Sequence, residues 1–511
     1  MKKIVAFSTC LVIFAFFTST AQKITYSEPD RDDLRSISYD IIGKISDNYL
    51  VYKSYRDNHF IAVYDDEMKV IAKLRMSYLP DRVLSASFIQ YPDFFYMIYQ
   101  YQKRNIVYCM GAKLDGRGKL MNDPVQLDTT GISFGTNNKI YSVVNSEDKK
   151  KIMIFKINSR EERVNYVTTV LLDKSLNILH KSRLSIPIPG RNNFLSEFLV
   201  DNEGDMGCVR AGGTAQSDNI SKLSLLTKSA MSDSFNTTDI NINGLFLDDI
   251  RLKVDNFNKH YLITSFFSKQ KRGNVDGLYT LLWDKQNEKQ IYADNVLFSD
   301  QLRAEARTEG NLKSAFNDYF MRHIIMKKNG GFIISAEAAY TSSRGNSMNR
   351  WDYLYNSPYY SPLMSGNYNY MYGSPFSYYY PWSGYNNYNI NRYYADNITI
   401  LSFDANGKVE WSNVIPKSQF DDNSDDFIGY GLMNSGDQIH FLFNIPDKRQ
   451  LIFSDQSITP DGQLVRLPTL KGLDRGYEFM PRQMKQTGIQ QFIIPCEYRN
   501  YVCFAKVEFN N

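Results

Sequence analysis

Alternating apolar and polar residues, interrupted by short turns, run along most of this 511-residue chain. The recurring pattern is an apolar run, a turn built on Asp, Asn or Gly, and a second apolar run, which predicts two antiparallel strands joined tightly. The clearest copies are residues 61–71, 107–120, 166–179, 278–292, 398–411 and 451–467.

Four-stranded units drawn outward from these turns recur roughly every 45 to 60 residues, a period typical of propeller blades. The unit beginning at Asn192 is the weakest, and merging residues 192–243 with a neighbour leaves seven units instead of eight. The eight units begin near Ser36, Asp81, Asn137, Asn192, Leu245, Asn317, Asp425 and Gly476.

The last unit shows three strands, at residues 479–485, 489–496 and 501–509. We expect residues 23–27 to supply its fourth strand, because an unpaired edge strand invites aggregation. The two ends of the chain would then close the ring of units.

On this blade pattern the chain resembles secreted β-propeller proteins over nearly all of its mature length. Trp283-Asp284 and Trp351-Asp352 occur singly, so the repeated Trp-Asp ending of one propeller class is missing, and no kelch double glycine recurs. The resemblance implies an all-β fold with a single propeller of seven or eight four-stranded blades, closed by pairing of the N- and C-terminal strands. Because the resemblance is one of pattern, it assigns no active-site residues to this chain.

The N-terminus has the three parts of an export signal. Lys2 and Lys3 precede an apolar run at residues 4–17, and small residues follow at 18–21. We therefore predict a signal peptide at residues 1–21 and a propeller domain at 22–511. The apolar run is too short to span a bilayer, and no later stretch reaches the roughly 20 apolar residues of a membrane helix. An exported protein, periplasmic, associated with the outer membrane or extracellular, is expected, and not an integral membrane protein.

Charge and cysteine content narrow the chemistry further. The formal net charge is +4, without the Lys/Arg stripe that binds phosphates, so a nucleic-acid partner is not expected. Once Cys10 leaves with the signal peptide, four cysteines are left, and Cys496 and Cys503 flank a predicted hairpin. They are a candidate disulfide in an oxidising compartment, the alternative being two packed thiols.

Two segments break the strand rhythm. Residues 300–316 favour one or two short helices between units. Residues 348–394 form an insertion between the second and third strands of the sixth unit, and 17 of the 44 residues in 351–394 are aromatic.

The insertion mixes tyrosine with Asn, Ser and Gly, a composition typical of adaptable binding loops. We expect it to contact a partner, an envelope protein or a glycan, the alternative being a loop of low complexity. The candidate binding residues are Trp351, Tyr353, Tyr355, Tyr359, Tyr360, Tyr368, Tyr370, Tyr372, Tyr378, Tyr379, Tyr380, Trp382 and Tyr385.

Motifs for catalysis and metal binding are sparse. Residues 131–135 match a Gly-x-Ser-x-Gly nucleophile elbow, but the following Thr-Asn-Asn-Lys and strand do not supply the helix that this motif requires. The five histidines lack metal-ligand spacing. Asp421, Asp422 and Asp425 are weak candidates for Ca²⁺, the alternative being a solvated acidic turn. No other cofactor is expected.

These observations favour a non-enzymatic binding or scaffold protein of the cell envelope, which contacts a protein partner through propeller loops. A glycan-acting hydrolase or lyase with a site at the central channel is the first alternative. It would require carboxylates or histidines from several blades to converge there. A surface adhesive protein is the second alternative.

Overall fold

The computed structural model describes thirteen stretches of the chain. They are residues 22–30, 37–55, 58–132, 140–161, 164–189, 193–213, 219–308, 310–343, 346–347, 391–422, 424–447, 450–466 and 476–509. The predicted signal peptide, the serine of the Gly-x-Ser-x-Gly match and most of the Tyr-rich insertion lie outside them.

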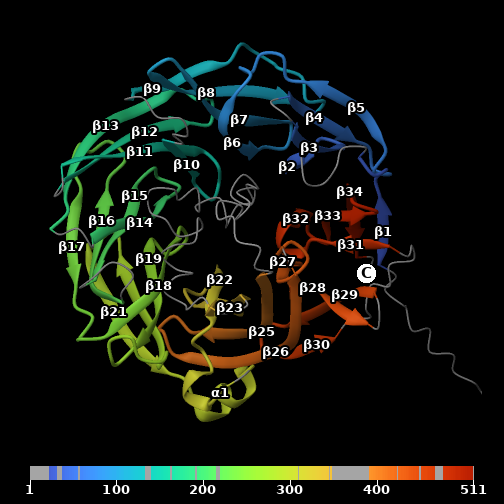
Figure 1. The fold of residues 1–511 in the computed structure, drawn as a ribbon. Helices are drawn as coiled ribbons and strands as arrows, with labels where there is room; N and C mark the ends of the chain where they lie inside the picture. Colours follow the sequence, from blue (N-terminus) through green and yellow to red (C-terminus); the bar gives the residue numbers. More distant parts are fainter. Residues whose placement is uncertain are drawn as a thin grey trace, which may run out of the picture.

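The described strands are arranged in a ring, as Figure 1 shows. They form seven antiparallel sheets, one of which contains eight strands. That sheet divides into two units of four, because in the described residues β16 and β18 are paired only at Ile220 and Leu247. The described chain is therefore a β-propeller of eight blades, each built around four strands, within the predicted range of seven or eight.

The first four blades follow the chain in order, with β2, β6, β10 and β14 nearest the centre of the ring (Figure 1). Blade 1 contains β2 (Ile37–Ile45), β3 (Asn48–Tyr55), β4 (Asn58–Tyr64) and β5 (Val70–Arg75). Blade 2 contains β6 (Val83–Gln90), β7 (Phe94–Lys103), β8 (Ile106–Asp115) and β9 (Val125–Gly131). Blade 3 contains β10 (Tyr141–Asn145), β11 (Lys151–Glu161), β12 (Val164–Asp173) and β13 (Ile178–Pro187). Blade 4 contains β14 (Asn193–Val200), β15 (Met206–Gly213), β16 (Ile220–Lys228) and β17 (Asn236–Ile240).

Blades 5 to 7 continue the series, and blade 6 carries an additional short strand. Blade 5 contains β18 (Phe246–Asp255), β19 (His260–Ser268), β20 (Gly277–Asp284) and β21 (Lys289–Leu297). Blade 6 contains β22 (Tyr319–Met326), β23 (Phe332–Ser343), β25 (Asn391–Phe403) and β26 (Val409–Asp422), with β24 (Asn346–Ser347) paired to β23. Blade 7 contains β27 (Tyr430–Asn434), β28 (Ile439–Asp447), β29 (Gln450–Ile458) and β30 (Leu464–Arg466).

Blade 8 joins the two ends of the chain. It contains β31 (Tyr477–Phe479), β32 (Lys485–Gly488), β33 (Gln491–Tyr498), β34 (Tyr501–Glu508) and β1 (Lys23–Tyr26). β1 pairs antiparallel with β34 from Lys23 opposite Glu508 to Tyr26 opposite Ala505, so the predicted closure is confirmed. One predicted strand is wrong: residues 479–485 are split into β31 and β32 by a 3-10 helix at Pro481–Gln483, because proline cannot donate to the ladder.

Two features between the blades also follow the prediction. The connection between blades 5 and 6 contains helix α1 (Asp300–Ala306) and a 3-10 helix at Leu312–Ser314. The insertion lies between β23 and β25, although β25 already begins at Asn391, so its last four predicted residues belong to a strand. In the described part of the chain, no helix is long and apolar enough to cross a membrane.

Aspartates begin the turns between the third and fourth strands of several blades, which explains why these turns could be predicted from the sequence. Asp65 Oδ1 accepts the backbone N–H groups of Glu67 and Lys69, both at 2.9 Å. Asp115, Asp173 and Asp404 make the same pair of bonds two and four residues onward. Each side chain replaces a backbone acceptor and closes the turn between the third and fourth strands of its blade.

Aromatic residues fill the spaces between neighbouring blades. Tyr39 of β2 meets Phe504 of β34 edge-on, with ring centroids 5.3 Å apart, across the seam between blades 1 and 8. Between blades 1 and 2, the ring centroids of Tyr52 and Phe88 are 5.1 Å apart. Sheets packed face to face need bulky inward side chains, which accounts for much of the 14% aromatic content.

Candidate functional site

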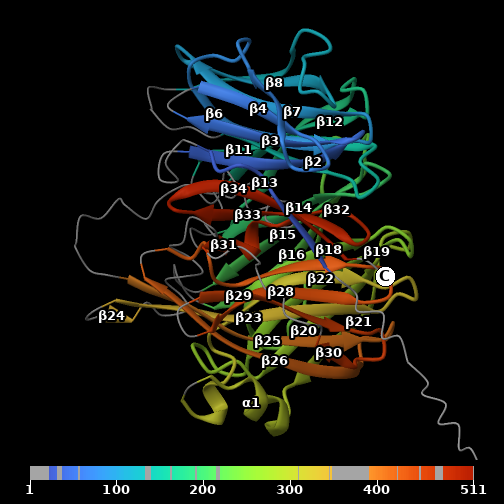
Figure 2. The same cartoon turned by 90° about the vertical axis from the view of Figure 1, so that its right-hand side faces the viewer.

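The second, third and fourth strands of blade 6 form an arm that extends past the other blades. β23, β25 and β26 have 12, 13 and 14 residues and are the longest strands in the described chain. Figure 2 shows β24, at the end of the arm, standing clear of the ring on one face. The Tyr-rich insertion joins β24 to β25, so the arm is the base of the insertion.

A row of aromatic side chains crosses the arm. The register places Tyr340 of β23 opposite Tyr394 of β25, and Tyr394 opposite Phe420 of β26. The rings of Tyr340 and Tyr394 are stacked at 4.6 Å and 11°, and Tyr394 lies 6.4 Å from Phe420. Tyr340 Oη also donates to Asp396 Oδ2 at 2.9 Å, which fixes the first ring of the row.

An ion pair lies next to this row on the same face, because strand residues two apart share a face. Arg392 Nε and Nη2 donate to the two carboxylate oxygens of Asp422, at 2.7 and 3.0 Å. The guanidinium carbon lies 4.5 Å from the centroid of the Phe420 ring, whose side chain is 56% exposed. We call Tyr340, Arg392, Tyr394, Phe420 and Asp422 the arm platform. It presents aromatic area and a bidentate ion pair to solvent.

The sequence predicted the insertion and not the platform. All thirteen candidate binding residues, from Trp351 to Tyr385, lie outside the described residues, so that expectation stays a prediction. Phe420 and Tyr340 were not singled out, because each reads as an ordinary residue of an alternating strand. The available signal was Tyr340, an aromatic residue that shortly precedes the Tyr-rich insertion.

The three aspartates predicted as weak calcium ligands have different surroundings. Asp422 pairs with Arg392, and Asp425 Oδ2 lies 2.7 Å from Arg482 Nη1. Burial, followed by the nearby carboxylates of Asp426 and Glu478, raises the pKa of Asp421 to about 7. Two of the three carboxylates are thus neutralised by arginines, and the calcium expectation stays a prediction.

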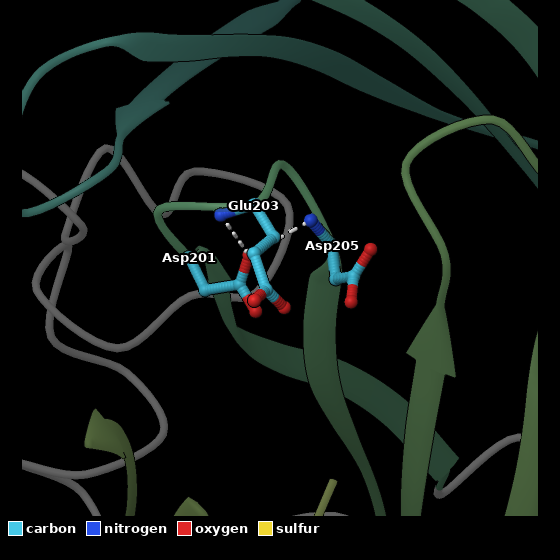
Figure 3. Close-up of side chains that lie close together, drawn as sticks. All are labelled: Asp201, Glu203 and Asp205. Carbon is cyan, nitrogen blue, oxygen red and sulfur yellow. Dashed lines mark hydrogen bonds between the residues drawn. The ribbon is translucent and has the colours of Figure 1, made fainter. Parts of the chain in front are cut away.

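Among the described residues, one group of three carboxylates has spacing suited to a cation, and it lies elsewhere. Asp201, Glu203 and Asp205 belong to the turn between β14 and β15, with ligand atoms within 4.8 Å of one another (Figure 3). Asp201 Oδ1 accepts the N–H groups of Glu203 and Asp205, both at 2.9 Å.

Lys285 supplies the positive charge for this group. Its ammonium hydrogen-bonds Asp201 and lies 3.3 Å from Glu203 Oε2 and 3.2 Å from Asp205 Oδ2. Lys259 forms a second ion pair with Glu203. The three carboxylates therefore converge on an ammonium group, and the cluster ties the turn of blade 4 to blade 5.

The most deeply buried ionic cluster surrounds Glu337 of β23, whose side chain is fully buried. Its Oε1 lies 2.8 Å from Lys417 Nζ, and its Oε2 lies 3.1 Å from Arg322 Nε and 3.2 Å from Arg482 Nη2. Burial opposes the charged carboxylate, but these three cations outweigh it and lower the pKa of Glu337 to about 2. We call Glu337, Lys417, Arg322 and Arg482 the Glu337 cluster. It joins blade 6 to the 3-10 helix of blade 8.

Inner strands of neighbouring blades are linked by carboxylates at strand irregularities. Asp249 of β18 has a φ of 47°, and its Oδ2 accepts the N–H of Met321 in β22 at 2.6 Å. Glu197 of β14 has a φ of 55°, and its Oε2 accepts the N–H of Leu252 in β18 at 3.3 Å. Arg251 lies 3.0 Å from Asp249 and 3.8 Å from Glu197. These carboxylates are engaged in holding the next blade.

His323 of β22 packs against a tyrosine of the neighbouring blade. Burial and then the charge of Arg322 lower the pKa of His323 to about 4, so the ring is neutral at pH 7. The ring meets that of Tyr430 at 5.5 Å, and Tyr430 Oη is 2.7 Å from Ser335 Oγ. The pair places a neutral imidazole beside a phenol between β22 of blade 6 and β27 of blade 7.

A surface hollow of about 610 Å³ lies between the turns of blades 2 and 3. Tyr91 crosses it and donates from Oη to the carbonyl of Lys149 at 2.7 Å, while Lys149 Nζ donates back to the carbonyl of Gln90 at 3.1 Å. The hollow thus marks a gap between two turns that already bridge each other.

A lone charge inside an apolar run was the available signal for the Glu337 cluster. Glu337 is the one charged residue between Phe332 and Tyr340, and its side chain is fully buried. Buried charges need partners. The identity of those partners depends on blade packing, which the sequence pattern does not encode.

No protein-family model matches the chain, and no curated protein matches it. Among solved structures it is similar to an ulvan lyase of polysaccharide lyase family PL25, at 10% identity over 82% of this chain and 90% of that one, with a TM-score of 0.36. It is also similar to the polysaccharide lyase Uly1, at 10% identity over 83% and 90%, with a TM-score of 0.39.

A third similarity is to prolyl oligopeptidase B from Galerina marginata, at 8% identity and a TM-score of 0.40. The match covers 91% of this chain but 56% of the peptidase, so this chain spans little more than half of that protein's length. The assignment of the fold rests on the hydrogen-bonded blades themselves.

Proposed function

We propose that this protein is a non-enzymatic binding protein of the cell envelope that contacts a protein partner through the arm of blade 6. The arm platform is the observation that carries the proposal. It holds aromatic rings and an arginine in fixed positions on three paired strands of blade 6, two of which, β23 and β25, flank the Tyr-rich insertion.

Physical chemistry favours this use of the platform. Tyrosine, phenylalanine and arginine are enriched at protein interfaces, and rigid aromatic contacts lose little entropy on binding. Phe420 remains 56% exposed although it is stabilised from one side by Arg392. The exposed ring offers apolar area that a partner gains free energy by covering.

The insertion can be removed without breaking the blade, which gives a sharp test. Ser343 and Asn391 are directly paired, so replacing residues 344–390 by Asn-Gly connects β23 to β25 through a two-residue hairpin turn. Captures from envelope extracts by wild type and by this variant are compared by mass spectrometry, with thermal unfolding as the check on folding. We expect one specific envelope protein to be lost. An unchanged capture profile from a folded variant would contradict the proposal.

Point variants separate the platform from the insertion. Phe420→Ala should weaken binding of the captured partner by on the order of tenfold if the ring is a hot spot. Phe257→Ala is the matched control, since Phe257 is 77% exposed in the turn between β18 and β19. If the partner bound both variants with equal affinity, Phe420 would not belong to the contact surface.

A glycan-acting enzyme with a site at the centre of the ring is the second candidate. The neutral His323 beside Tyr430 supports it, because a neutral imidazole can accept a proton. The test is depolymerisation of a panel of acidic glycans by wild type and His323→Ala. Activity that is abolished by His323→Ala would replace the binding proposal.

A further inference from the structure

Two cysteines face each other inside the last blade. Cys496 of β33 is paired with Cys503 of β34, and the two Sγ atoms are 2.8 Å apart. Both side chains are fully buried. Cys109 and Cys208 are also buried thiols but belong to blades 2 and 4.

We propose that Cys496 and Cys503 form a disulfide bond in the exported protein, and that this bond forms before blade 8 packs against its neighbours. The proposal depends on export to an oxidising compartment and is independent of the partner-binding proposal.

The hairpin holds the two residues in a register that permits the bond. Arg499 and Asn500 connect Tyr498 to Tyr501 with φ values of 51° and 67°, the positive values of a two-residue hairpin turn that matches strand twist. Directly opposed residues have Cα atoms about 4.5 to 5.5 Å apart, inside the range of about 4.4 to 6.8 Å found for disulfides. Closing the sulfur atoms from 2.8 Å to about 2.05 Å needs only a small side-chain rotation.

The oxidation is a thiol–disulfide exchange with a protein or small-molecule disulfide of the same compartment. One cysteine thiolate attacks a sulfur of that oxidant, and the other oxidant sulfur leaves as a thiolate. The second cysteine then attacks the mixed disulfide and releases the remaining oxidant sulfur. The protein loses two protons and two electrons, and the disulfide of the oxidant is reduced to two thiols.

Burial sets the order of events. In the closed blade the two thiols lie in an apolar cluster with Phe453 and Met433 of blade 7, and β1 covers the outer edge of β34. Burial and the adjacent Cys503 raise the pKa of the Cys496 thiol, so it stays protonated and unreactive there. An external oxidant reaches these sulfurs only while the hairpin is unpacked. The seven-residue separation allows that hairpin to form early.

Differential alkylation tests the bond. The protein of residues 1–511 is expressed for export through its predicted signal peptide and denatured in the presence of iodoacetamide without reductant. It is then reduced and treated with a second, heavier alkylating reagent. We expect Cys109 and Cys208 to carry the first label and Cys496 and Cys503 to carry the second. Before labelling, the intact mass of the protein should be lower by two hydrogen atoms than that of the reduced protein. First label on all four cysteines would overturn the bond.

The order of events has its own test. Folded protein prepared in a reducing cytoplasm is incubated with oxidised glutathione under native conditions, and a parallel sample is refolded from denaturant in the same buffer. The bond should appear in the refolded sample and not in the native one. Oxidation of both samples at equal rates would overturn the proposed order and leave the bond itself to the alkylation result.

Discussion

Glu337 Oε1 lies 2.8 Å from Lys417 Nζ, although the two residues stand on β23 and β26 with β25 between them. Lys417 reaches this position beside an irregularity in the pairing of β25 with β26, where the register shifts between Asp396 and Ile398. Its ammonium also donates to the carbonyl of Ala395 and to Gln419 Oε1, both at 2.8 Å. One buried carboxylate thereby organises blade 6 and, through Arg482, its contact with blade 8.

Replacing Glu337 with glutamine should destabilise the protein strongly. The substitution keeps the shape but leaves Lys417, Arg322 and Arg482 buried without their shared anion, a loss of about 3 to 5 kcal/mol in the free energy of unfolding. Denaturant titration measures it. The control is Glu410→Gln, which breaks the more exposed Lys327–Glu410 pair and should cost about 1 kcal/mol or less. If both variants lost the same free energy of unfolding, the Glu337 cluster would contribute no more to stability than an exposed ion pair.

Asp421 predicts a pH dependence of stability with a definite sign. Its pKa is raised from 3.8 to about 7 in the folded state, so its contribution to stability is complete below about pH 4 and is lost as the pH rises through 7. Asp421→Asn lacks this loss, and its stability relative to wild type should increase between pH 4 and pH 8. Unfolding free energies at both pH values check this.

Asp422→Asn is the control with the opposite sign. The Arg392 guanidinium lowers the pKa of Asp422, so its contribution is present at neutral pH and is lost as the pH falls through the lowered pKa. This variant should therefore be less stable than wild type at pH 7 and approach it in acid. Parallel pH profiles for the two variants would contradict the assignment of both carboxylates.

Turn chemistry explains why the blades could be predicted from the sequence. Asp65, Asp115, Asp173 and Asp404 close their turns with their own side chains, so local residues suffice to mark where the third strand ends. The predicted start near Asn192 corresponds to β14 at Asn193, and the start near Gly476 to β31 at Tyr477. The broken first strand of blade 8 was missed, because Pro481 was read within a continuous run.

The candidate site was less accessible to sequence reasoning, because its residues meet only after the blades pack. Arg482 and Glu337 are 145 positions apart, and Phe420 meets Tyr340 through the strand between them. Alternation predicts that a side chain faces one side of a sheet, but it does not tell which residue of another strand or blade lies opposite. The composition of the Tyr-rich insertion drew attention to blade 6 but did not indicate the arm platform at its base.

Gly277 is predicted to tolerate no side chain. A Cβ at this first residue of β20 would lie 1.9 Å from the carbonyl oxygen of Val296 on the paired strand β21, and the backbone there has no flexible end that can move aside. Gly277→Ala should lower the free energy of unfolding by about 3 kcal/mol. Gly131→Ala, where the nearest atom is 4.0 Å away, should change it little. Thermal and denaturant unfolding measure both changes, and equal stabilities of the two variants would contradict the prediction.

Closure of the ring by β1 leads to the last prediction. Tyr26 stacks on Tyr477 with ring centroids 4.1 Å apart and lies 6.1 Å from Phe479, so this one side chain joins β1 to the inner strand of blade 8. Tyr26→Ala should lower the free energy of unfolding by about 2 kcal/mol, while Lys23→Ala, at an exposed position of the same strand, should be nearly neutral.

Removing residues 22–27 should have a larger effect than Tyr26→Ala, because it leaves β34 as an open edge. That variant should aggregate on heating below the wild-type midpoint, which light scattering measures. A truncated protein that stays monomeric and unfolds at the wild-type temperature would show that the ring is held closed without β1.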